Sequence, residues 1–145
     1  MSILQFIKDH FTQTDHSHLV SQDGQSILSN WEIGGHHVQV VFYVQNDEFL
    51  MIRVGDLYKF PQNSPVYRAV LDEINSCNKN YRFTKAMCDP DNGEVVVSGE
   101  AWFVNEVPNA STFDHLYDAV TTASMDLLKA IDKLLNENDS RKLAC

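Results

Sequence analysis

Cysteine is scarce in this chain and is not arranged for any of its usual roles. Only three of the 145 residues are cysteines, Cys77, Cys88 and Cys145, and no two of them form a CxxC pair. An odd number of widely spaced cysteines argues against a disulfide framework and against a cysteine-based zinc site. We therefore expect Cys77 and Cys88 to be small buried side chains, and Cys145 to be a free thiol in the tail.

Long apolar runs and an excess of basic charge are also missing. No stretch approaches the roughly 18 apolar residues of a membrane span, and the first eight residues do not resemble a secretory signal. We therefore expect a soluble, cytoplasmic protein with no membrane partner. Lys and Arg number 11 against 20 Asp and Glu, a formal net charge of −9, so the basic footprint that nucleic-acid binding requires is absent. Nucleic acid is not expected as a partner.

The length and the patterning of the chain predict a single domain. A chain of 145 residues with 43% hydrophobic residues can bury a sizeable core, and no repeat or linker divides it. We expect residues 1–137 to form one domain, followed by a polar C-terminal tail over residues 138–145. The tail carries no apolar periodicity and is expected to fray.

The first half of the chain predicts one helix and three strands. Ser2 and Gln5 form a capping-box pattern, and apolar residues at helical spacing continue to Phe11 before a polar run ends the helix. Residues 26–33 read as a short strand that Gly34 and Gly35 interrupt. Residues 38–45 and 49–54 alternate as the two strands of a hairpin, with turn chemistry between them.

The second half predicts a helix, a hairpin and a long final helix. Ser64 is a candidate N-cap for a helix over residues 64–78, with Pro65 at its first position. Residues 81–88 and 95–104 form a hairpin around the turn at residues 89–93, and the return strand is partly apolar on both faces, so both faces of the sheet could be covered. The last helix runs from Ser111, its expected N-cap, to about residue 137. The expected fold is α+β, with an antiparallel sheet of about five strands and flanking helices in the order α-β-β-β-α-β-β-α.

The histidines are the strongest candidates for a metal site, but they lack partners. His16 and His18 are two residues apart and His36 and His37 are adjacent, so each pair could share a divalent ion. A metal site needs a third or fourth ligand held by further hydrogen bonds, and nothing in the sequence marks one. We expect solvated loop histidines, no metal and no cofactor.

No pattern in the sequence supports catalysis. A nucleophile needs an adjacent base and often a strained Gly-flanked turn, whereas Ser98 and Gly99 lie within a strand pattern. There Gly99 is better explained by a bulge or by the close approach of a helix. Asp89 and Asp91 lie in a turn, where a carboxyl remains solvated, and no phosphate-binding glycine motif occurs. The prediction is a protein without catalytic residues, and not an enzyme.

The order of elements resembles the YbjN-like family. The resemblance extends over about residues 2–135 and is most specific in residues 66–104, which include the segments YRF and DPDNGEVVV. That family is described as regulators of bacterial sensory transduction and is related in fold to the type III secretion chaperones. The resemblance implies a small acidic α+β protein, usually dimeric, that binds other proteins and catalyses no reaction.

Two functions from different classes remain open at this point. The first is a non-enzymatic protein-binding module, chaperone-like or regulatory, which dimerises through apolar helix surface and holds a segment of a client protein. Its candidate contacts are Tyr67, Val70 and Trp102, since these side chains are large and one thin layer cannot bury all of them. The alternative is a small-molecule sensor or enzyme with a pocket between sheet and helices. Such a pocket would be lined by polar side chains such as those of His36, His37 or Arg53.

Overall fold

The computed structural model describes residues 2–143, with side chains as far as residue 138. Within these residues the elements are α1 (Ile3–Gln13), β1 (Leu19–Val20), β2 (Ser26–Ile33), β3 (His36–Gln45), β4 (Phe49–Lys59), α2 (Tyr67–Asn80), β5 (Thr84–Cys88), β6 (Glu94–Trp102) and α3 (Ala110–Leu143). The strands form one antiparallel sheet in the order β1-β2-β3-β4-β6-β5. The predicted α+β class is confirmed, with β1 as an additional short strand.

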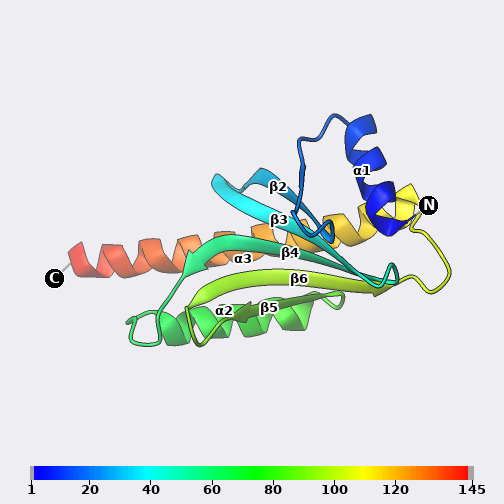
Figure 1. Ribbon diagram of the computed structural model, residues 1–145. Helices are drawn as coiled ribbons and strands as arrows, with labels where there is room; N and C mark the ends of the chain where they lie inside the picture. Colours follow the sequence, from blue (N-terminus) through cyan, green and yellow to red (C-terminus); the bar gives the residue numbers. More distant parts are fainter. Residues whose placement is uncertain (1, 144–145) are drawn as a thin grey trace.

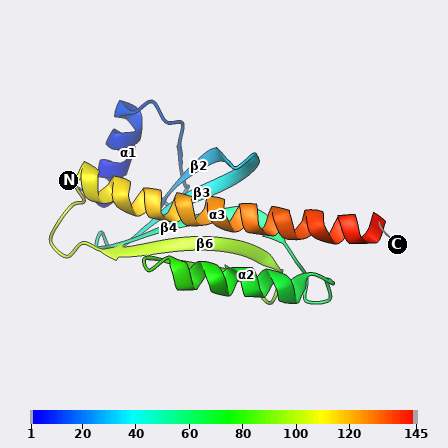
Figure 2. The ribbon, with the colours of Figure 1, turned by 180° about the vertical axis from the view of Figure 1, so that it is seen from behind.

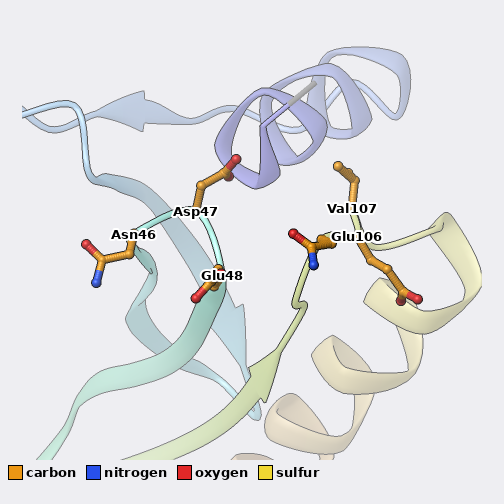
Figure 3. A pocket seen from close by; sticks show the side chains of 6 residues that line it. Asn46, Asp47, Glu48, Glu106 and Val107 are labelled. Carbon is orange, nitrogen blue, oxygen red and sulfur yellow. The ribbon is translucent and has the colours of Figure 1, made fainter.

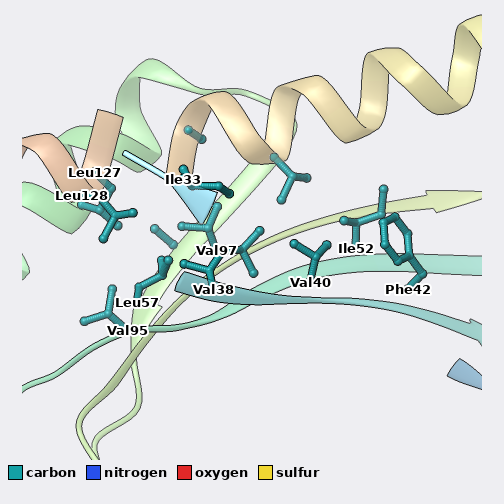
Figure 4. Packing of buried hydrophobic residues seen from close by; sticks show 14 of the residues in the cluster. Ile33, Val38, Val40, Phe42, Ile52, Leu57, Val95, Val97, Leu127 and Leu128 are labelled. Carbon is teal, nitrogen blue, oxygen red and sulfur yellow. The ribbon is translucent and has the colours of Figure 1, made fainter. Parts of the chain in front are cut away.

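All three helices pack on the same face of the sheet (Figures 1 and 2). Figure 4 shows apolar side chains from successive strands pointing toward α3, and they form one core with the buried residues of the helices. Along each strand every second side chain belongs to this core, as Val40, Phe42, Ile52 and Val97 do. No described helix covers the other face, although the apolar residues on both sides of β6 would allow for two covered faces.

The two tight turns of the first half fix the register of β2, β3 and β4. Gly34 and Gly35 have φ values of 57° and 83° and form the hairpin turn between β2 and β3, so β3 begins at His36, earlier than expected. Asn46 and Asp47, each with φ of 54°, form the turn between β3 and β4. Strand β4 is longer than expected, because pairing with β6 resumes at Tyr58 after a bulge.

Helix α2 begins at Tyr67, three residues later than predicted. The carbonyl of Ser64 accepts a hydrogen bond from the Tyr67 N–H at 3.1 Å, so residues 64–66 form a separate turn. The N-cap position is Val66, which makes no side-chain cap bond. At the other end the N–H of Tyr81 donates to the carbonyl of Cys77 at 3.0 Å, so Tyr81 closes the helix and β5 starts only at Thr84.

The predicted hairpin of β5 and β6 is confirmed. Asp89 Oδ1 accepts the N–H of Asp91 at 2.8 Å, and Gly93 takes φ of 74°. A side chain at Gly93 would also be obstructed, since its Cβ would lie 2.4 Å from the carbonyl oxygen of Phe60. The turn therefore needs glycine for two separate reasons, backbone conformation and space.

Helix α3 differs from expectation at both ends. Its N-cap is Asn109, whose Oδ1 accepts the N–H of Thr112 at 2.8 Å, rather than Ser111. Residues 138–143, predicted as frayed tail, continue the helix, and Cys145 lies outside the described residues. Most of the apolar stripe of α3 is buried by the sheet and α2. Within the described residues, no helix has the length and hydropathy needed to cross a membrane.

Candidate protein-interaction surfaces

Gly99 positions α3 on the sheet. A Cβ added at Gly99 would lie 2.6 Å from Cγ2 of Val120 and 3.3 Å from Cδ1 of Leu116, so the helix packs directly on the β6 backbone. The predicted close approach of a helix at Gly99 is confirmed. This approach places the first turns of α3 beside the C-terminal half of β6.

An open groove of about 360 Å³, which we call the α3 groove, lies beside these first turns. Most of the side chains along it are apolar, and Phe83, just before β5, is 78% exposed at its wall. Its lining residues are Phe83, Glu100, Ala101, Phe103, Thr112, His115, Leu116 and Ala119. An adjoining pocket of about 310 Å³ shares Phe83 and Glu100 and adds Arg82 and Lys85. Two of the 11 basic side chains of the sequence therefore flank an apolar groove.

A second apolar surface is the face of the sheet that no described helix covers, which we call the open face. Its strand positions alternate with those of the core and are absent from the core cluster. Trp102 is 68% exposed there. The centroid of its ring lies 4.9 Å from the ring centroid of its cross-strand partner Phe49. The apolar strand residues on the open face are Leu28, Val41, Tyr43, Phe49, Met51, Met87, Val96 and Trp102.

The open face is close to neutral, although the chain as a whole is strongly acidic. Alternation along β2, β4, β5 and β6 places three basic and three acidic strand residues on this face, and the exposed Asp56 in the β4 bulge beside Glu94 brings their sum to −1, against −9 for the sequence. Arg53 Nη2 lies 3.6 Å from Glu94 Oε2. The six residues are Arg53, Lys59, Lys85, Glu32, Glu94 and Glu100.

Two histidine–carboxylate pairs attach α3 to its neighbours. Asp132 on α3 lies 3.0 Å from Nε2 of His36 on β3 and accepts a hydrogen bond from the hydroxyl of Tyr58 on β4. Burial and the hydrogen bond to Asp132 raise the pKa of Tyr58 to about 12. Burial alone would raise the pKa of Asp132, but the hydrogen bonds from Tyr58 and His36 outweigh it and lower that pKa. Near the start of α3, His10 of α1 lies 3.1 Å from Asp114.

The expectation that the grouped histidines are solvated loop side chains is wrong in part for each of the four, because His36 and His37 belong to β3 and the loop residues His16 and His18 are half-buried. His36 belongs to the Asp132 pair, and His16 packs on Trp31 with ring centroids 4.7 Å apart. His18 packs against Phe11, with ring centroids 5.7 Å apart. His37 is exposed on the open face. The described residues contain no group of three or more His, Cys, Asp or Glu side chains that could hold a metal ion.

A polar pocket of about 300 Å³ lies between the β3–β4 turn and the loop before α3 (Figure 3). Three carboxylates line it, but Asp47 is already committed, because its Oδ1 accepts the N–H of Ile3 at 2.7 Å. Figure 3 shows Asp47 pointing toward α1. Asp47 therefore fixes the start of α1 to the sheet, and the pocket presents no pair of groups arranged for acid–base chemistry.

The residues predicted from the sequence as binding contacts lie in different places. Val70 has no exposed surface and belongs to the core, Tyr67 is half-buried against that core, and Trp102 is exposed on the open face. Phe83 was not among them, although strand alternation could indicate it: if Thr84, Ala86 and Cys88 face inward, residue 83 faces outward.

The residues proposed for a small-molecule pocket do not converge. His36 faces α3, whereas His37 and Arg53 lie on the open face. Burial raises the pKa of Cys77, with a smaller contribution from Asp126, and it raises that of Cys88 in the same way beside Asp89. Both thiols are buried, as predicted, and so are poor nucleophiles.

The fold and these surfaces define an α+β protein with one helix-covered face, one open face and an apolar groove. The chain belongs to the YbjN family, whose model, described as "Putative bacterial sensory transduction regulator", matches residues 3–133. The resemblance seen in the sequence is thereby confirmed.

Comparison with solved structures agrees on the fold. The chain is similar to the protein in the "Crystal structure of YbjN, a putative transcription regulator from E. coli", with a TM-score of 0.63 and 12% identity over 90% of this chain and 92% of that chain. At this identity the similarity shows a shared fold. No curated protein matches the chain.

Proposed function

We propose that this protein is a non-enzymatic regulatory module that forms a homodimer and holds a segment of a client protein in the α3 groove. The observation that carries this proposal is an apolar groove with a large aromatic side chain, Phe83, exposed at its wall. An aromatic residue beside a concave apolar surface is typical of a site that anchors a partner side chain. The family description as a regulator is consistent with such a role.

The surroundings of the groove specify the chemistry of the client segment. Arg82 lines the adjoining pocket, so a carboxylate next to the apolar anchors of the client would be favoured. The segment that fits best therefore combines two or three apolar side chains with neighbouring acidic residues. This combination also explains why a chain with net charge of −9 does not simply repel it.

Client binding through an added strand at β5 is impeded at Ala86. β5 is the outer strand on this side of the sheet, and the outward N–H of Ala86 donates to Asn78 Oδ1 at 2.7 Å. Asn78 Nδ2 donates in turn to the carbonyl of Ala86 at 3.0 Å. This pairing occupies the main-chain groups at the middle of a five-residue edge strand, which an added strand would need. The proposal therefore places side chains of the client in the groove.

A binding assay with a permanently unfolded acidic protein tests the proposal. Fluorescently labelled, reduced and carboxymethylated α-lactalbumin serves as the probe, and its anisotropy is followed during titration with the dimer. Ala119→Glu places a carboxylate in the α3 groove and is expected to weaken binding at least about tenfold, because an apolar contact is replaced by a charge that must keep its water. Ala69→Glu on α2 is the matched control and should bind as the wild type does. Absence of binding by the wild type, or equal binding by Ala119→Glu, would refute the proposal.

A further inference from the structure

We infer that the open face is the surface through which two copies of this chain associate, with their sheets stacked face to face. The inference rests on the homodimer of the proposed function but not on client binding. Of the eight apolar side chains on the open face, Met87 and Trp102 are exposed, five are half-buried and Val96 is 5% exposed. Exposed and half-buried apolar side chains gathered on neighbouring strands are typical of an interaction site. No described element of the same chain covers it.

The charge distribution favours a second copy as the occupant. Two chains of net charge −9 repel each other over most of their surfaces, whereas the open face has three basic and three acidic strand residues. A partner for this face must be apolar and carry both signs of charge in nearly equal number. A second open face meets both conditions.

The strand register shows that the charges can pair under two-fold symmetry. Arg53, Ser98 and Lys85 form one row across β4, β6 and β5, and Glu100 and Met51 lie in the next row. We place the two-fold axis midway between the two stacked sheets, perpendicular to the strands and at the level of Gly99. It brings each row of one copy opposite the other row of the second copy. Glu100 then lies opposite Ser98 of the other chain, between its Arg53 and its Lys85.

The same axis pairs large side chains with small ones. Two residues beyond Glu100, Trp102 falls opposite Val96 of the other copy, and Phe49 falls opposite Gly55. A side chain at Gly55 would meet only Glu94 Oε1, at 3.2 Å, so space is available above it. On β3 the axis sets Tyr43 opposite Val41.

Alternation of this kind lets two sheets interdigitate. Stacked sheets lie about 10 Å apart with their strands within about 30° of each other. A single symmetry axis therefore pairs opposite charges across the interface and also places large side chains opposite small ones. The stacking leaves the side of the α3 groove formed by Phe83, Leu116 and Ala119 accessible to a client, whereas the adjoining pocket shares Lys85, Ser98 and Glu100 with the interface.

A charge-swap experiment tests the inference. Analytical ultracentrifugation of the full chain should show a dimer for the wild type. Glu100→Lys places a lysine between Arg53 and Lys85 of the other copy and should raise the dimer dissociation constant about a hundredfold. The double variant Arg53→Glu/Lys85→Glu should be equally impaired. Because each variant then carries the charge that the other lacks, an equimolar mixture should restore the dimer as a mixed species.

Control variants separate the possible outcomes. Asp72→Lys, an exposed charge change on α2, should dimerise as the wild type does. A wild type that is monomeric at 100 µM overturns both this inference and the homodimer of the proposed function. A dimer that withstands Glu100→Lys, or variants that fail to recombine while circular dichroism shows them folded, overturns the open-face interface alone. Client binding is scored separately with Ala119→Glu.

Discussion

Gly99 lets α3 pack directly on the sheet, and Gly99→Ala is expected to lower the free energy of unfolding by about 1.5 kcal/mol. The added Cβ would lie 2.6 Å from a methyl of Val120, which is fully buried. Overpacking at such a position costs about 1–3 kcal/mol. Replacing glycine within a strand returns about 0.5–1 kcal/mol, because the unfolded chain loses backbone freedom. Asp132 holds α3 to β3 and β4, so the helix cannot relax freely.

Urea unfolding followed by circular dichroism, at one fixed protein concentration, measures this cost. A double-mutant cycle with Val120→Ala identifies its origin, since that substitution removes the methyl with which the new Cβ collides. We expect Gly99→Ala/Val120→Ala to be more stable than the sum of the single effects predicts, by at least about 1 kcal/mol. Additive effects, or a Gly99→Ala variant as stable as the wild type, would refute the reasoning.

Two further predictions concern the contacts that hold the helices to the sheet. Asp47→Ala removes the hydrogen bond to the Ile3 N–H and should lower the free energy of unfolding, measured by thermal unfolding, by about 1 kcal/mol. Asp47→Asn keeps an acceptor and tolerates positive φ, so it should lower the free energy of unfolding by less. Asp132→Asn should cost about 1 kcal/mol at pH 7, a value discounted because Asp132 is 36% exposed. Because the pKa of Asp132 is lowered by folding, its stabilisation is fully present above its usual value of 3.8 and is lost as pH falls through the lowered pKa. The stability difference between Asp132→Asn and the wild type should therefore narrow between pH 5 and pH 2 in denaturant titrations, and a constant difference would contradict the assignment.

Local sequence patterns were sufficient to predict most of the elements. The capping pattern at Ser2, the alternation around residues 38–54 and the turn at residues 89–93 depend on interactions between neighbouring residues, so the sequence displays them directly. The boundaries that were wrong depend on competition between adjacent caps. Ser64 and Ser111 are good N-cap residues. However, α2 begins after Val66 and α3 begins after Asn109, because the packing of each helix on the sheet decides between neighbouring start positions.

The candidate site was less predictable, because it arises from contacts between distant residues. The apolar positions on both sides of β6 indicate two apolar faces, but not that all three helices would choose the same one. Val70 and Trp102 are both apolar in the sequence, and only the packing of α2 separates a core residue from an exposed one. The pairing at the edge of β5 likewise depends on Asn78, whose partner Ala86 lies beyond a turn.

A distance measurement between two copies tests the central claim, that the open face joins them, most directly. Spin labels at Asn30→Cys, an exposed β2 position on the open face, are introduced together with Cys145→Ser, while the buried native Cys77 and Cys88 react slowly because burial raises their pKa values. Asn30 lies three residues along the strands from the level of the proposed axis, so sheets stacked about 10 Å apart predict a label-to-label distance of roughly 20 Å by pulsed electron paramagnetic resonance. A label at Asn75→Cys, exposed on α2, should give a much longer distance. A long distance at Asn30, or a shorter distance at Asn75 than at Asn30, would contradict the account.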